Sequence, residues 1–129
     1  MILGVGVDIV EISRMGRLLR SPWAEIFVNR VFSQEEIRAC RESAHPAEGF
    51  SARFAAKEAV TKALGTGFKK GVSPDQIIVK GGEHAQPSII LEGYALEIAE
   101  SMQVGKIHVS LTHSRNAACA FVVIERRRQ

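Results

Sequence analysis

Charged side chains interrupt an apolar helical pattern in the segment RFAAKEAVTKALGTG, residues 53–67. Phe54, Glu58 and Lys62 are spaced four residues apart, so a helix here would place them on one face. Gly65 continues that face at the end of the segment. The simplest interpretation is an exposed ion pair between Glu58 and Lys62, which stabilises a helix by about 0.2–0.5 kcal/mol.

Asp8 supplies a second carboxylate from a distant part of the chain. It stands in ILGVGVDI, residues 2–9, an apolar and β-branched run that predicts a largely buried strand ending near Asp8. A carboxylate in apolar surroundings must be hydrated, paired or bound to a metal, because stranding it there is costly. Mg²⁺ commonly takes one or two protein carboxylates and fills its shell with water and phosphate oxygens. Asp8 and Glu58, with Lys62 nearby, therefore predict a magnesium site that bridges to a phosphate compound.

A glycine-rich loop with two lysines follows the helix, in the segment GTGFKKG at residues 65–71. Its glycines, with Lys69 and Lys70, could hold phosphates. The loop is no P-loop, because it follows a helix C-terminus, whose dipole repels anions. Lys62, the loop lysines and the metal would have to supply the positive charge. A plain surface turn fits the local sequence equally well.

Arginines recur at three-residue spacing in the segment after the first strand, which predicts a basic ridge on a helix. A solvated helix face is one interpretation of this ridge. A dock for an acidic protein partner is the other, with apolar anchors among the charges. The arginines at this spacing are Arg14, Arg17 and Arg20, with Arg30 further along the chain, and the anchors are Met15 and Phe27. Nucleic acid fits less well, because the net charge is only +3 and no recognition motif is present.

The remaining candidate groups give weaker signals. His113 stands at a predicted strand end beside Thr112, where a hydrogen-bonded turn residue is more common than a catalyst. Cys40 and Cys119 lack the spacing of a zinc or redox site. Two isolated thiols favour a reducing, cytoplasmic location. The N-terminus has no basic leader, so we expect no signal peptide, and no apolar run approaches the ~20 residues of a membrane helix.

The 129 residues, with 46% hydrophobic and 24% charged residues, predict a single domain over residues 1–129. Periodicity and turn signals predict an α+β fold with a mainly antiparallel sheet and a long central helix. The expected strands are 2–9, 76–80, 88–92, 106–113 and 117–125. The expected helices are 11–20, 33–43, 47–64 and 93–103, with a capping box at Ser33 and Glu36 and a helix end at Gly105.

With these residues in view, the sequence resembles the holo-[acyl-carrier-protein] synthase family of phosphopantetheinyl transferases. Three segments carry the resemblance in the family's order: GVGVDIVEISR, RFAAKEAVTKALGTGF and HVSLTHSRNAACAFVVIE. Their length and internal order make the match specific. With the intervening RVFSQEE, it extends over nearly the whole chain.

The resemblance implies a reaction and a set of roles. The family transfers 4′-phosphopantetheine from coenzyme A to a serine of apo-acyl carrier protein, releases 3′,5′-ADP and serves fatty acid biosynthesis. Asp8 and Glu58 would ligate Mg²⁺ and act in catalysis with Lys62, which would lie against phosphate. Either Glu58 or a metal-bound water would accept the serine proton.

The resemblance also implies binding surfaces. Gly65, Thr112 and His113 would lie near coenzyme A, and Arg14 would lead the carrier-protein dock formed with Met15, Arg17, Phe27 and Arg30. The family's small members are homotrimers with active sites between subunits. A non-catalytic adaptor that grips an acidic protein through the ridge is the alternative, although such an adaptor has no use for the pair of Asp8 and Glu58.

Overall fold

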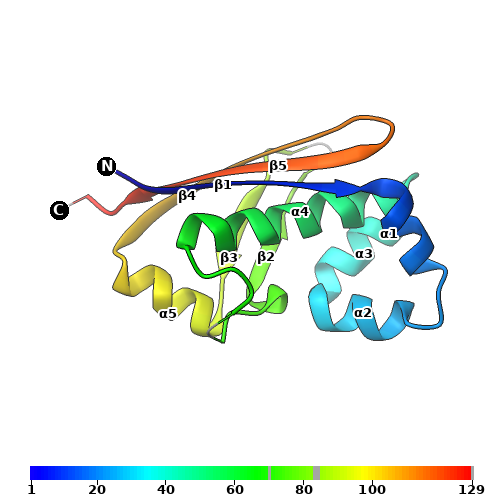
Figure 1. Cartoon of the computed structure of the whole chain (residues 1–129), viewed down its shortest axis with the longest axis horizontal. Coiled ribbons are helices and arrows are strands. Elements are labelled where there is room, and N and C mark those ends of the chain that lie inside the picture. The colour runs from blue at the N-terminus through cyan, green and yellow to red at the C-terminus, as the bar shows by residue number, and fades with distance from the viewer. Residues whose placement is uncertain (70, 83–84, 129) are drawn as a thin grey trace.

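The computed structural model describes residues 1–69, 71–82 and 85–128. Lys70, one of the lysines predicted to hold phosphate, lies outside the described residues. Along the chain the elements follow in the order β1, α1, α2, α3, α4, β2, β3, α5, β4 and β5, with a short 3-10 helix before β2 (Figure 1). Among the described helices, none is both long and apolar enough to cross a membrane.

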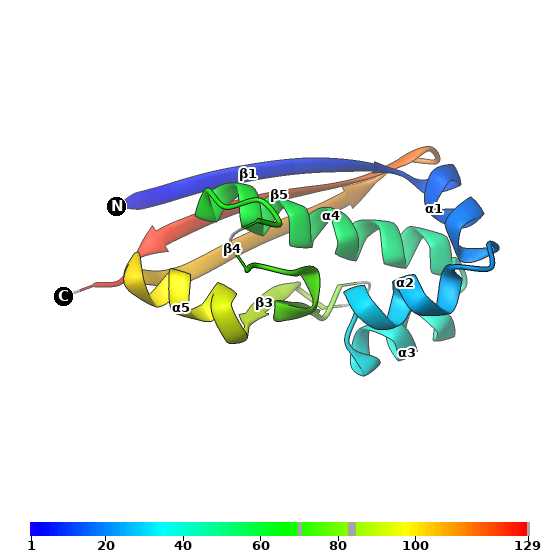
Figure 2. The same cartoon turned by 60° about the horizontal axis from the view of Figure 1, so that its bottom comes forward.

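Two antiparallel sheets form the β part of the fold. β1 (Ile2–Glu11), β5 (Ala117–Arg126) and β4 (Val104–His113) form one sheet, with β5 in the middle. β2 (Ile77–Lys80) and β3 (Ser88–Leu91) form the other. The long helix α4 runs along one face of the three-stranded sheet, with α1 to α3 at one end and α5 at the other (Figures 1 and 2). The predicted α+β fold with a mainly antiparallel sheet and a long central helix is confirmed.

β1 packs so closely against α4 (Pro46–Leu64) that a side chain cannot fit at two of its glycines. A Cβ atom at Gly6 would lie 1.9 Å from the carbonyl oxygen of Ala59. A Cβ atom at Gly4 would lie 2.1 Å from the carbonyl oxygen of Ala63. The two alanines on α4 are buried in the contact. The glycines therefore set the distance between the strand that carries Asp8 and the helix that carries Glu58.

Three further helices enclose a second apolar cluster beside α4. They are α1 (Ile12–Leu19), α2 (Ala24–Val31) and α3 (Gln34–Glu42). The sequence pattern predicts no helix at α2. Its N-cap residue, Trp23, makes no side-chain cap hydrogen bond, so the usual start signal is missing. Burial of Val28 against the neighbouring helices stabilises α2 instead.

Of two other predicted helix ends, the structure confirms one and contradicts the other. The capping box is confirmed, because Ser33 Oγ accepts a hydrogen bond from the Glu36 amide and Glu36 Oε1 accepts one from the Ser33 amide. The helix end predicted at Gly105 is wrong, because α5 (Gly93–Ser101) ends earlier and Gly105 lies in β4. The backbone of Arg127 passes within 2.6 Å of where its Cβ would stand, which accounts for the glycine.

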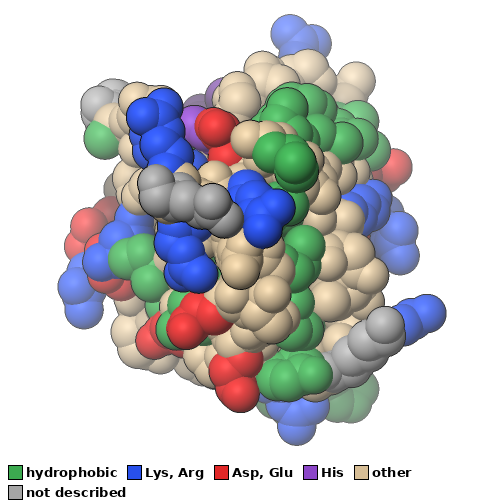
Figure 3. All heavy atoms as spheres, turned by 90° about the vertical axis from the view of Figure 1, so that its left-hand side faces the viewer, with side chains coloured by type: hydrophobic (Ala, Val, Ile, Leu, Met, Phe, Trp, Pro, Cys, Tyr) green, Lys and Arg blue, Asp and Glu red, His purple; other side chains and the backbone are tan. Residues whose placement is uncertain are grey.

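The prediction of a largely buried first strand is wrong in two respects. β1 continues past Asp8 to Glu11, and its side chains alternate between the α4 side and an uncovered face of the sheet. Val5, Val7 and Ile9 are exposed on that face, together with Phe121 of the neighbouring β5. Continuous apolar sequence indicates burial on both faces, whereas a single chain covers only one. Seen from the end that carries both termini, the molecule shows hydrophobic side chains at its surface beside Lys and Arg (Figure 3).

Candidate active site

Asp8 and Lys62 form an ion pair between the strand and the helix. Alternation along β1 places Asp8 on the same side as Gly4 and Gly6, facing α4. Lys62 Nζ donates to Asp8 Oδ1 at 2.9 Å and to the carbonyl oxygen of Val7 at 3.1 Å. The Asp8 side chain is only 12% exposed, whereas that of Lys62 is 52% exposed. Lys62 therefore directs its charge to the strand, and its hydrogen bond to Asp8 raises its pKa.

Glu58 completes a pair of acids beside this lysine. Partial burial raises the pKa of Glu58, the charge of Asp8 and a hydrogen bond with Asp8 raise it further, and the charge of Lys62 opposes the shift. The structure thus brings together the three residues predicted to act in catalysis. A half-buried acid that holds its proton more tightly than usual can act as a proton acceptor closer to neutral pH.

A pocket of about 860 Å³ opens at these acids, and we call it the carboxylate pocket. β1 contributes Asp8, α4 contributes Glu58, and α1 and α2 contribute residues of the predicted dock. The lining residues are Asp8, Ile9, Val10, Glu11, Arg14, Met15, Leu18, Phe27, Phe54, Glu58, Asn116 and Ala117. The acids therefore share one pocket with part of the predicted docking surface.

The predicted dock residues differ in their access to this pocket. Arg14 is exposed and lines the pocket directly. Met15 is 4% exposed, so it contributes to the pocket wall and does not project from the ridge as an anchor. Phe27 is half-buried, with its ring centroid 5.9 Å from that of Phe54. Arg17 and Arg30 are exposed on α1 and α2 without lining the pocket.

A second pocket, of about 420 Å³, lies where the end of β4 meets α3 and α4, and we call it the hairpin pocket. Thr112 and His113 line it, as do Glu48 and Arg53 of α4. His113 Nε2 lies 3.0 Å from Glu48 Oε1. Neither Glu48 nor Arg53 is predicted as a site residue from the sequence. The available signal was the position of Arg53 at the start of RFAAKEA, one turn before Lys57.

Among the residues that the structure describes, the two pockets share no lining residue, so a single chain places the predicted site residues in two separate pockets. Asp8 pairs with Ala120 of β5, and Ala120 pairs with Leu111 of β4. The middle strand therefore separates the acids from the hairpin end that carries Thr112 and His113. Gly65 lies apart from both pockets as the left-handed C-cap of α4, with φ of 82°.

The donor set at Asp8 and Glu58 fits Mg²⁺. Two carboxylates from different elements meet at the edge of a pocket, and like charge between them disfavours their joint ionisation unless a cation is present. Within the described ranges, no three His, Cys, Asp or Glu side chains gather at metal-binding distance. A bound cation would therefore complete its coordination with water and substrate oxygens, as Mg²⁺ commonly does.

The family model of the 4′-phosphopantetheinyl transferase superfamily matches residues 4–122. The chain belongs to this superfamily. The matched range includes both acids, Lys62 and the lining residues of both pockets.

Within this superfamily, the chain is similar to holo-[acyl-carrier-protein] synthases in both sequence and structure. The holo-[acyl-carrier-protein] synthase of Syntrophus aciditrophicus is 42% identical over 125 residues, which are 97% of this chain and 97% of that protein. The crystal structure of the Neisseria meningitidis holo-[acyl-carrier-protein] synthase superposes with a TM-score of 0.87 at 30% identity, covering 98% of this chain and 100% of that one. The Helicobacter pylori enzyme, solved in complex with coenzyme A, gives a TM-score of 0.81 at 28% identity over 94% of this chain and 99% of that one.

Proposed function

We propose that this chain transfers 4′-phosphopantetheine from coenzyme A to a serine of apo-acyl carrier protein, giving holo-acyl carrier protein and 3′,5′-ADP. Family membership and full-length similarity to holo-[acyl-carrier-protein] synthases support the reaction. The observation that carries the proposal is the contact of Asp8 with Glu58, beside Lys62, at the edge of the carboxylate pocket. Phosphoryl transfer depends mainly on such positioned charge.

Asp8 and Glu58 would hold Mg²⁺. The bound cation would neutralise negative charge on the pyrophosphate of coenzyme A. Lys62, half-exposed and able to turn from Asp8 toward substrate, would bind a phosphate oxygen and stabilise the leaving nucleotide. Glu58, with its raised pKa, is the side chain here that could accept the proton of the attacking serine.

The complete site forms between copies of the chain in a homotrimer. One copy would supply Asp8, Glu58, Lys62 and Gly65, and a second would supply Thr112 and His113 from its hairpin pocket. Two observations support this arrangement. The half-sites lie on opposite sides of the middle strand, and the outer face of the sheet exposes Val5, Val7, Ile9 and Phe121. A contact between copies would remove that apolar surface from water.

The carrier protein would dock over the carboxylate pocket. Arg14, Arg17 and Arg30 would attract its acidic surface and orient the serine toward Glu58, while Phe27 would offer apolar contact. This association should weaken as salt screens the charges. The reaction would serve fatty acid biosynthesis in the cytoplasm.

One assay separates the transferase from a non-catalytic adaptor. The purified protein is incubated with apo-acyl carrier protein and coenzyme A, with Mg²⁺ or with a chelator, and the carrier is weighed by mass spectrometry. We expect the carrier to gain the mass of one phosphopantetheine group only when Mg²⁺ is present. Binding of the carrier protein without any gain of mass would favour the adaptor and contradict the proposal.

A further inference from the structure

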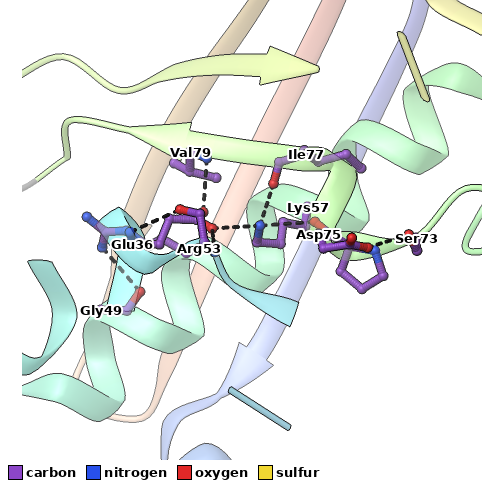
Figure 4. Close-up of polar contacts among 10 residues, drawn as sticks. Glu36, Gly49, Arg53, Lys57, Ser73, Asp75, Ile77 and Val79 are labelled. Carbon is purple, nitrogen blue, oxygen red and sulfur yellow. Dashed lines mark hydrogen bonds and ion pairs between the residues drawn. The ribbon is translucent and has the colours of Figure 1, made fainter. Parts of the chain in front are cut away.

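Lys57 is a fully buried lysine that the proposed reaction does not use. It lies next to Glu58 in α4, but its side chain has 0% relative exposure and points away from the carboxylate pocket. Lys57 Nζ donates to Glu36 Oε1 at 2.9 Å, to the carbonyl oxygen of Pro74 at 3.0 Å and to that of Ile77 (Figure 4). One ammonium group thus joins α4 to α3 and to the start of β2.

Glu36 extends the same network. Its Oε1 accepts hydrogen bonds from Lys57 and from the Ser33 amide, and its Oε2 accepts one from the amide of Val79 at 3.0 Å. Its side chain is only 1% exposed. The carboxylate therefore caps α3, pairs with α4 and holds the middle of β2 at the same time (Figure 4).

Residues of α3 and α4, and the residue that directly follows β2, line the hairpin pocket. Cys40 of α3 lines the pocket and lies one turn after Glu36. Arg53 of α4 lines it and lies one turn before Lys57. Gly81 lines it and lies two residues after Val79. Each of these three lining residues is therefore separated by no more than about 7 Å of backbone from Glu36, Lys57 or Val79, which the network holds in place.

Arg53 forms a second tie at the level of the pocket. Its Nη2 donates to the carbonyl oxygen of Gly81 at 3.2 Å, and its Nη1 donates to that of Gly49 at 3.4 Å. The bond to Gly81 is exposed and the bond to Gly49 is long, whereas the bonds of Glu36 to Lys57 and to the Val79 amide are buried. The buried pair is therefore the firmer of the two links between α4 and β2.

The energetics also favour a geometric role over a stabilising one. Burial lowers the pKa of Lys57, although the charge of Glu36 and the hydrogen bond with it oppose the shift. Replacement of a buried ion pair by well-packed apolar residues is often neutral or stabilising, so stability alone does not account for a buried lysine and glutamate here. The Lys57 ammonium also lies over the aromatic ring of Phe32, with Nζ 5.4 Å from the ring centroid.

We propose that the buried pair of Lys57 and Glu36 is a positioning device for coenzyme A, because it fixes the spacing of α3, α4 and the end of β2, where residues of the hairpin pocket lie. The proposal rests on the proposed function, in which this pocket receives part of the nucleotide. Loss of the pair would let β2 and α3 move relative to α4. The carboxylate pocket, on the other side of α4, would keep its acids and Lys62.

The test compares K57M and E36Q with wild type in the transfer assay, below the melting temperature of each variant. Glutamine still caps α3, so E36Q preserves the helix start and serves if K57M fails to fold. We expect KM for coenzyme A to rise about ten-fold or more and the Kd for 3′,5′-ADP, measured by calorimetry, to rise in parallel. We expect kcat and KM for the carrier protein to stay within about two-fold of wild type.

Two control variants distinguish positioning from general destabilisation. V122A removes buried volume from the sheet side of the core and should lower Tm without changing KM for coenzyme A. R41M removes an ion pair with Glu25 whose side chains are 50% and 71% exposed, and should change neither quantity.

Unchanged KM and nucleotide affinity in folded K57M or E36Q, or equal loss of all kinetic constants, would overturn the positioning role alone. Failure of both variants to fold would make the pair a stability element and also overturn the positioning role. Absence of transfer by the wild type would refute the proposed function itself.

Discussion

The substitution G6A tests whether the contact of β1 with α4 positions the two acids. The added Cβ atom would lie 1.9 Å from the carbonyl oxygen of Ala59, whereas Cβ atoms are essentially never found closer than 3.0 Å to such an atom. The contacting atom belongs to the helix backbone, so it cannot rotate away. The strand and the helix must therefore separate by about 1 Å at this point.

The separation moves Asp8, two residues along the strand, away from Glu58. Overpacking of this kind costs about 1–3 kcal/mol of unfolding free energy. A displacement of about 1 Å at a catalytic group can lower the rate about 100-fold. We therefore expect G6A to remain folded, to lose about 100-fold in kcat/KM for transfer, and to need much more Mg²⁺ for half-maximal rate.

The assay combines urea unfolding with transfer rates at several Mg²⁺ concentrations. G16A is the matched control, because the atom nearest to its new Cβ is the movable guanidinium nitrogen of Arg20, at 3.3 Å. Alanine also favours a helix over glycine by about 1 kcal/mol, so G16A should be as stable as wild type or more so. Wild-type Mg²⁺ dependence in G6A would refute the idea that this contact sets the distance between the acids.

Four further predictions test the site and its surfaces. D8A and E58A should each abolish transfer while leaving a folded protein by circular dichroism; normal turnover of either at limiting Mg²⁺ would rule out its role as a ligand. Because burial and the charge of Asp8 raise the pKa of Glu58 above 4.5, stability measured without cation should fall as pH rises from 4.5 to the raised value, and Mg²⁺ should reverse that loss; a flat difference between wild type and E58Q across this range would contradict the shift. R14A should raise KM for the carrier protein several-fold more than KM for coenzyme A, and equal effects would count against docking. Light scattering should give a trimer mass, and F121D, on the exposed sheet face, should lower both mass and activity; an active monomer would contradict the shared site.

Local sequence patterns predicted the elements that local interactions stabilise. The capping box at Ser33 and Glu36 depends on residues within one helical turn, so the sequence predicts it directly. Asp8 was singled out because a lone carboxylate in an apolar strand needs a partner, and the structure supplies Lys62 and Glu58. The sequence does not predict α2, because this helix has no side-chain cap at its start. Packing against residues that are distant in the sequence stabilises it instead.

The features that the sequence does not predict depend on contacts between residues that are distant in the chain. Glu36 had a complete local explanation as the second member of the capping box, so nothing in its surroundings pointed to a lysine 21 residues away. The reach of Lys57 to Pro74 and Ile77 depends equally on the path of the chain between α4 and β2. Arg53 and Glu48 become site residues only when β4 lies beside them. The open face of β1 likewise depends on which elements cover the sheet, and an apolar run cannot distinguish a strand covered by its own chain from one covered by a second copy.

Direct titration of a divalent cation tests the central claim, that Asp8 and Glu58 together bind a metal against the nucleotide. Mn²⁺, a paramagnetic substitute for Mg²⁺, is titrated into the protein in the presence of coenzyme A and followed by electron paramagnetic resonance, for wild type, D8N, E58Q and R14A. We expect one bound Mn²⁺ per chain in wild type and R14A, and at least about ten-fold weaker binding in D8N and E58Q. Equal Mn²⁺ affinity in all four proteins would contradict the claim.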